Sequence, residues 1–178
     1  PKLDIQIRNV HGKEDTLITI QIDQMLAEKF GMEYIDRDGQ KKNPYIIHRT
    51  SMGCYERTLA LLLEKYGGAM PMWLAPEQIR VIPISERLSA EARALTDRIT
   101  AAGFRATCDD RGEKMGYRIR EAQLEKIPYM LIVGDKEIAD GTVSVRARSG
   151  GDIGTMTLDD FLARAKEEVE TRYIEKQK

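Results

Sequence analysis

The sequence predicts an α/β protein made of two unequal parts that join near Pro71 to Pro76. In residues 1–76, short segments that alternate apolar and polar residues precede one helical pattern, as antiparallel strands followed by a helix would. In residues 77–178, strand and helix patterns alternate, which is typical of a largely parallel sheet covered by helices. We therefore expect a complete α/β domain preceded by an incomplete antiparallel β plus helix remnant.

The first part begins with two half-buried strands, because apolar residues alternate with polar ones at 3–7 and at 18–22. Leu26 to Phe30 predicts a short helical turn. Met32 to Asp36 predicts another strand, closed by the turn residues Asp38-Gly39. A few strands with open edges rarely form a whole domain. We therefore expect the chain to be part of a longer protein.

A strand-to-helix turn ends this part. The bulky and β-branched residues from Tyr45 to Arg49 favour a strand. From about Gly53 a helical pattern follows, and Gly67-Gly68 end it. Arg57 falls in the first helical turn, where the helix dipole mildly disfavours a cation, so it suggests an anionic partner. One helix face gathers Leu59, Leu62, Leu63 and Tyr66.

The second part opens with a β-α-β-α-β pattern. Strands are expected at Arg80 to Ile84, Phe104 to Asp109 and Tyr129 to Val133, with helices at Ser89 to Ala102 and Lys114 to Glu125. Helical connections of this kind join parallel strands by right-handed crossovers.

The C-terminal segment predicts a hairpin and a last helix. Lys136 to Ile138 and Thr142 to Arg148 would pair around Asp140-Gly141. Thr157 is the expected N-cap of the final helix. That helix should bury Leu158, Phe161, Leu162, Ala165, Val169 and Tyr173. The complete domain would then hold a mixed sheet of about five strands with three helices.

Composition excludes several classes. The chain has 178 residues, 32% charged and 42% hydrophobic, as ordinary globular proteins do. No apolar run approaches the roughly 20 residues of a membrane span, and no signal-peptide pattern opens the chain. Its two cysteines, Cys54 and Cys108, give no disulfide framework, which favours a reducing compartment, so we expect a cytoplasmic protein.

A resemblance to a known family lies in three runs: His48-Arg49-Thr50, Gly53-Cys54-Tyr55-Glu56-Arg57 and Met72-Trp73-Leu74-Ala75-Pro76. Together they resemble the third signature motif of class II aminoacyl-tRNA synthetases, here over residues 44–76, in the threonyl form. Residues 77–178 are similar to the anticodon-binding domain of the threonyl, histidyl, prolyl and glycyl members. The resemblance implies that residues 1–76 are the C-terminal part of a catalytic domain and residues 77–178 an anticodon-binding domain.

The resemblance also implies a pocket for ATP and the amino acid, with Arg57 as its catalytic residue. The positions that match are Lys2, Thr19, Gln21, Cys54 and Arg57. A planar guanidinium there can stack on adenine and offset phosphate charge. The residues alone leave other interpretations open. Arg57 could form a buried salt bridge, and residues 16–23 could be an ordinary amphipathic strand. For Cys54 they favour a small buried side chain.

His48 is the one candidate metal ligand. A strand-end histidine is more often structural than metal-binding, but the resemblance implies a zinc ligand at this position, where the metal holds threonine. The family's other ligands lie upstream, so we expect little or no zinc in this chain. ATP with Mg²⁺ would be a substrate of the parent enzyme.

For the anticodon, the resemblance implies contacts by Lys114, Arg118, Glu137 and Arg146. Cations can hold phosphates, while mixed donors and acceptors distinguish unstacked bases. The alternative is a solvated helix face beside an edge strand protected by charge.

Two functions follow from these patterns. One is a fragment of a threonine–tRNA ligase whose parent is a homodimer that acts on threonine tRNA, ATP and threonine. In isolation this fragment would recognise the anticodon but lack catalysis. The other is a non-catalytic RNA-binding or accessory protein with the same type of domain.

Overall fold

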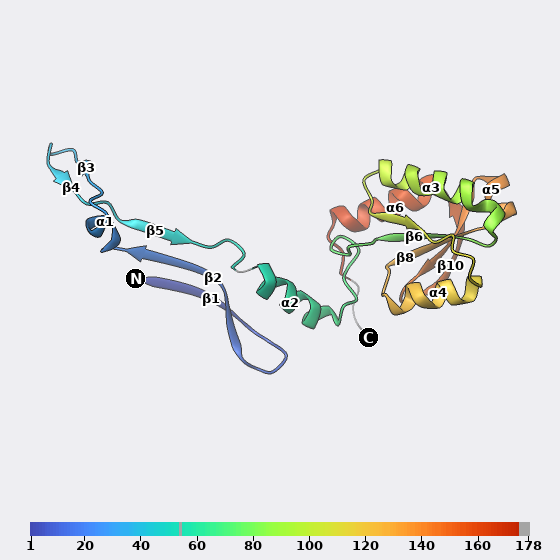
Figure 1. Ribbon diagram of the computed structural model, residues 1–178, viewed down its shortest axis with the longest axis horizontal. Coiled ribbons are helices and arrows are strands. Elements are labelled where there is room, and N and C mark those ends of the chain that lie inside the picture. The colour runs from blue at the N-terminus through green and yellow to red at the C-terminus, as the bar shows by residue number, and fades with distance from the viewer. Residues whose placement is uncertain (54, 175–178) are drawn as a thin grey trace. The chain divides into compact units, whose positions relative to one another are not determined.

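The computed structural model describes residues 1–53 and 55–174. Its contacts divide the chain into two compact units, Pro1–Lys65 and Tyr66–Lys178, which we call the first and second units and describe separately (Figure 1). The α/β fold class is confirmed. Among the described residues, no helix is both long and apolar enough to span a bilayer.

The first unit is built on a three-stranded antiparallel sheet in the order β1-β2-β5. The strands are β1 (Lys2–Arg8), β2 (Glu14–Asp23) and β5 (Ile46–Arg49). The predicted short helix is α1 (Leu26–Lys29), and the turn at Asp38-Gly39 joins a small hairpin. Its strands are β3 (Tyr34–Ile35) and β4 (Lys41–Lys42).

Helix α2 (Tyr55–Tyr66) follows β5 and presents its leucine-rich face to solvent. Leu59 and Leu63 on that face are 55% and 47% exposed. The opposite face, with Arg57 and Leu61, lines a shallow hollow together with Leu17 of β2. Large apolar side chains of this unit are thus mostly accessible, and its strands enclose little core.

The second unit contains a five-stranded mixed sheet in the order β10-β9-β8-β6-β7. Its strands are β6 (Ile79–Pro83), β7 (Ala106–Cys108), β8 (Tyr129–Val133), β9 (Thr142–Ala147) and β10 (Gly151–Thr157). Strand β6 runs parallel to both β7 and β8, and β9 runs antiparallel to β8 and β10. The parallel strands and their helical crossovers agree with the prediction.

Helices cover both faces of this sheet (Figure 1). Residues of α3 (Ser89–Ala101) and α6 (Leu158–Glu170) share the larger apolar core with Val81 and Leu131. On the other face, α4 (Met115–Leu124) packs over Ile82 and Met130. Consecutive strand residues alternate between these two cores, as the pleat requires.

The predicted hairpin of residues 136–138 with 142–148 is wrong. Residues Asp135–Asp140 form a helix, α5, whose first turn is closed by the Glu137 carboxylate accepting the Gly134 N–H at 2.9 Å. Gly141 ends α5 in the left-handed conformation, at φ 67°. The hairpin instead joins β9 to β10. In the described part of this unit, α5 is therefore a fourth α-helix where three were predicted.

Helix α6 begins as predicted, since the Thr157 hydroxyl accepts the Asp160 N–H at 3.1 Å. Leu158, Phe161 and Ala165 are buried. The expected burial of Tyr173 is wrong, because α6 ends at Glu170 and Tyr173 is 54% exposed.

The segment before β6 belongs to the second unit, because the division by contacts falls between Lys65 and Tyr66. The domain boundary at 76/77 stays a prediction. Met72 and Ala75 in this segment are buried. Polar side chains hold its carbonyl groups: Gln78 Nε2 donates to Met72 O at 2.9 Å, and Arg105 Nε to Ala75 O at 2.9 Å. Residues 66–76 are thereby fixed to the sheet of the second unit.

We expect Gln78→Ala to destabilise the second unit by about 2 kcal/mol, because buried backbone groups lose their partner. Gln78 is 2% exposed and also accepts the Arg105 N–H at 2.8 Å. Urea unfolding followed by fluorescence of Trp73, the single tryptophan, measures the change. The exposed Gln123→Ala is the control, and equal losses in both variants would contradict the prediction.

Candidate functional site

Three predicted site residues form a row across the sheet of the first unit. Lys2 of β1 lies opposite Gln21 of β2, and Gln21 lies opposite His48 of β5. Directly opposite residues of antiparallel strands project to the same face of a sheet. Thr19, two residues before Gln21, shares that face. The structure therefore brings Lys2, Thr19, Gln21 and His48 onto one polar face.

A carboxylate that the sequence analysis missed completes this face. Asp4 lies opposite Thr19, whose hydroxyl donates to Asp4 Oδ1 at 2.6 Å. Lys2 Nζ lies 3.0 Å from Asp4 Oδ2. The hydrogen bond from Thr19, followed by that from Lys2, lowers the pKa of Asp4 below its ordinary value. Asp4 follows Lys2 by two residues, so the strand period was a signal for it.

His48 has one carboxylate beside it. Its Nε2 lies 3.6 Å from Oδ2 of Asp23. Asp23 accepts the N–H groups of Leu26 and Met25, at 2.9 and 2.8 Å, and these bonds lower its pKa. Among the described residues, no three His, Cys, Asp or Glu side chains gather as metal ligands. These residues do not fit a three-ligand zinc site, so no step below involves zinc.

Arg57 reaches from α2 to β2. Its Nη1 donates to the Thr16 carbonyl at 2.8 Å, and its side chain is exposed. It is therefore not the buried salt bridge that the sequence left open. Cys54, the other predicted contact at this turn, lies outside the described residues.

Gly53 fixes the geometry of this turn. Its φ of 67° is one that side chains disfavour, and a Cβ atom there would lie 2.1 Å from the Leu17 carbonyl oxygen. Only glycine lets the chain between β5 and α2 pass so close to β2. The close approach of Leu17 thus explains why the motif has glycine at position 53.

The predicted anticodon residues lie on three elements of the second unit. Lys114 is exposed at the N-cap of α4. Glu137 lies in α5, which packs against β9, and Arg146 lies on β9, half-buried on the face opposite Val145. The Glu137 carboxylate closes the first turn of α5, so one of its oxygens is already engaged.

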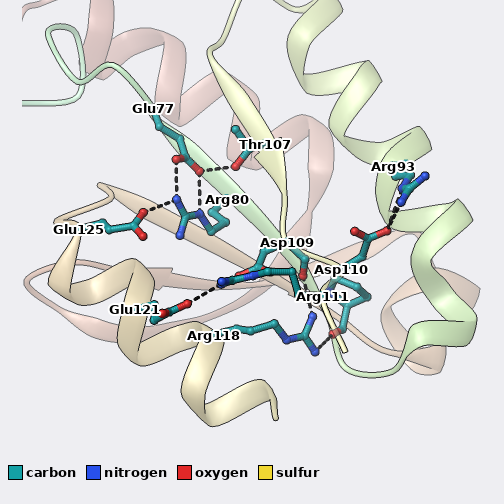
Figure 2. Close-up of polar contacts among 11 residues, drawn as sticks. Glu77, Arg80, Arg93, Thr107, Asp109, Asp110, Arg111, Arg118, Glu121 and Glu125 are labelled. Carbon is teal, nitrogen blue, oxygen red and sulfur yellow. Dashed lines mark hydrogen bonds and ion pairs between the residues drawn. The ribbon is translucent and has the colours of Figure 1, made fainter. Parts of the chain in front are cut away.

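Arg118, which the resemblance implied as an anticodon contact, does not lie on a solvated helix face, the alternative that the sequence left open. Its side chain is 3% exposed beneath α4. Nη1 donates to the Asp109 carbonyl at 2.6 Å and Nη2 to the Pro83 carbonyl at 2.8 Å (Figure 2). Lys114 is exposed on the helix surface, whereas Arg118 is buried.

Ion pairs that sequence reasoning missed surround this region (Figure 2). Arg111 lies 2.8 Å from the Asp109 carboxylate and 2.5 Å from that of Glu121. The hydrogen bond from Arg111 holds the pKa of Asp109 below its usual range. On β6, Arg80 bonds both Glu77 and Glu125. Glu121 and Glu125 lie 10 and 45 residues along the chain from their arginine partners, so no local pattern indicated these two contacts.

Comparison with known proteins decides the family. Residues 78–168 match the family model described as anticodon binding domain, and residues 1–66 match the tRNA synthetase class II core domain (G, H, P, S and T). The chain is 57% identical over 172 residues to the threonine–tRNA ligase of Clostridium perfringens strain SM101. The chain belongs to the threonyl-tRNA synthetase family. It corresponds to a C-terminal portion that covers the end of the class II core and the anticodon-binding domain.

The threonyl-tRNA synthetase relatives are longer than this chain. The match to the C. perfringens enzyme covers 97% of this chain but 27% of that protein. The threonine–tRNA ligase of Caldanaerobacter subterraneus is 46% identical over 174 residues, again 27% of its length. A crystal structure of the RNA binding domain of threonyl-tRNA synthetase from Cryptosporidium parvum Iowa II superposes with a TM-score of 0.81. The two sequences are 32% identical, and the match covers 94% of this chain and 42% of the C. parvum chain.

We expect Gly53→Ala to loosen the junction between β5 and β2, because the new methyl group would collide with the Leu17 carbonyl. Amide exchange at Thr50, whose N–H bonds Thr19 O at 3.0 Å, should accelerate about tenfold. Gly12→Ala is the matched control, since Gly12 has a φ of 77° with nothing within 4 Å of a Cβ. Similar acceleration at Thr50 in both variants would show that strain rather than contact matters.

Proposed function

We propose that this chain forms one wall of the catalytic site of a threonine–tRNA ligase and recognises the anticodon arm of threonine tRNA. One observation carries the proposal: the same chain contains the row of Lys2, Gln21 and His48 and a match to the anticodon binding domain family. The parent protein would form threonyl-adenylate from ATP and threonine, and then transfer the threonyl group to tRNA. It would act as a cytoplasmic homodimer.

In the first unit, the polar face would orient substrates rather than supply a general base. Lys2 and Arg57 bring positive charge for ATP phosphates, with Mg²⁺ accompanying the nucleotide. Thr19 and Gln21 offer hydroxyl and amide groups for hydrogen bonds. Adenylate formation depends on positioning and charge stabilisation at the α-phosphate, so a single wall should not suffice. The isolated chain is therefore expected to be inactive.

In the second unit, Arg146 is the best-placed residue for RNA. Its Nε is buried and has no hydrogen-bond partner among the described residues. A half-buried guanidinium on β9 would add a charged contact to the exposed Lys114. Glu137 keeps its second carboxylate oxygen as an acceptor for a base edge.

Threonine-dependent pyrophosphate exchange tests the catalytic half. The 178-residue chain should show no exchange above a blank, because the remaining walls of the site lie outside it. A longer protein with the upstream class II core should be active, and Arg57→Ala in it should reduce exchange about a hundredfold or more. Threonine-dependent turnover by this chain alone would overturn the proposal.

Charge reversal at Arg146 tests the RNA-binding half. Arg146→Glu should weaken binding of a threonine tRNA anticodon stem-loop at least about tenfold, because a phosphate or base contact becomes repulsive. Arg164→Glu is the matched control, since Arg164 is exposed on α6, across the sheet from Arg146. Equal weakening by both changes in a titration would refute the proposed face.

A further inference from the structure

Arg118 is a cation almost completely enclosed by the protein. With 3% of its surface exposed, its two terminal nitrogens are both taken by carbonyl oxygens. Its Nε is also buried, without a hydrogen-bond partner among the described residues. A guanidinium held in this way cannot bind a phosphate without breaking bonds that support its own fold.

The two carbonyls that Arg118 holds come from neighbouring strand ends. Pro83 is the last residue of β6, and Asp109 directly follows β7. Because β6 and β7 are parallel, their carboxyl ends meet at one edge of the sheet, where ligands bind in open α/β sheets. Arg118 therefore joins the starts of two connecting loops, residues 84–88, which contain the 3-10 helix η1 (Glu86–Leu88), and residues 109–114, at the edge where a ligand is expected.

The loop that leads to Lys114 is also held on its other side. Arg111 bonds the Asp109 carboxylate and reaches Glu121 on α4. The Asp109 carboxylate also lies close enough to Arg118 for the positive charge of Arg118 to help lower its pKa. The buried cation thus has an anion beside it, and the loop between β7 and α4 is tied to both elements.

We propose that Arg118 is a positioning residue for RNA: it anchors residues 84–88 and 109–114, and so orients Lys114, without touching the RNA itself. The inference rests on the RNA recognition proposed above for the second unit. Lysine at 118 would keep the charge, but its single nitrogen cannot span both carbonyls in the planar geometry of a guanidinium.

The salt dependence of RNA binding separates positioning from phosphate contact. Each phosphate contact on single-stranded RNA contributes about 0.7 to the slope of log K against log salt concentration. We expect Arg118→Lys and Arg118→Met to bind the threonine tRNA anticodon stem-loop about tenfold more weakly with the wild-type slope. Lys114→Met, which removes an exposed cation, should lower the slope by about 0.7. A slope that falls in Arg118→Met but not in Arg118→Lys would make Arg118 a phosphate ligand and overturn the proposal.

Amide hydrogen exchange gives a readout that needs no RNA. Arg118→Lys should accelerate exchange in residues 84–88 and 109–114 while leaving α6 unchanged. Arg120→Met is the matched control, because Arg120 is exposed on the same helix and should leave both loops protected. Unchanged exchange in Arg118→Lys would refute the anchoring role.

The two failures are distinguishable. If the wild-type chain does not bind the stem-loop, RNA recognition by the second unit is refuted, and the exchange data still decide whether Arg118 anchors the loops. If the wild type binds and both Arg118 variants bind equally well, the positioning role alone is refuted.

Discussion

Backbone carbonyl groups at strand ends and in the segments between strands need partners, and arginine and glutamine side chains supply several of them. Arg118 holds the ends of β6 and β7, while Gln78 and Arg105 hold the segment that enters β6. Buried backbone groups without partners are costly, so these side chains decide whether the irregular segments can lie against the sheet. Strand β6, whose residues are all buried, depends on them at both of its ends.

This use of cations changes how the charged residues of the second unit are interpreted. Arg80, Arg111 and Arg118 are engaged by carboxylates or carbonyls of the protein, whereas Lys114 stays exposed. The positive charges near the proposed RNA-binding edge are thus of two kinds: cations that support the edge, and cations that remain accessible to a ligand. The two carboxylate oxygens of Glu137 divide in the same way. One accepts the Gly134 N–H and so supports α5, and the other remains available as an acceptor.

The two units differ in how completely they are packed. The second unit encloses its apolar residues in two cores on either side of one sheet. The first unit leaves Leu59 and Leu63 of α2 largely exposed beside a sheet with two open edges. Its polar face holds aligned substrate-binding candidates on three strands, and the chain spans 27% of the length of its curated relatives. Those facts are consistent with one wall of a larger site.

Local sequence determined the features that depend on neighbours along the chain. The strand at Tyr129–Val133, the Thr157 cap and the turn at Asp38-Gly39 follow from β-propensity, side-chain capping and turn chemistry. The motif around Gly53 identified the family. The sequence also shows that Arg118 is a hydrogen-bond donor, but it does not show that the acceptors are the carbonyls of Pro83 and Asp109.

Tertiary structure decided the features that depend on partners distant in sequence. Strand register placed Lys2, Gln21 and His48 in one row, and packing of α4 on the sheet buried Arg118. Residues 135–140 had too short a pattern to distinguish helix from strand, and the bond between Glu137 and Gly134 settled the helix. The physical reason is the same in each case. Hydrogen-bond partners and burial are properties of the folded structure, whereas the sequence shows only which donors, acceptors and apolar groups are present.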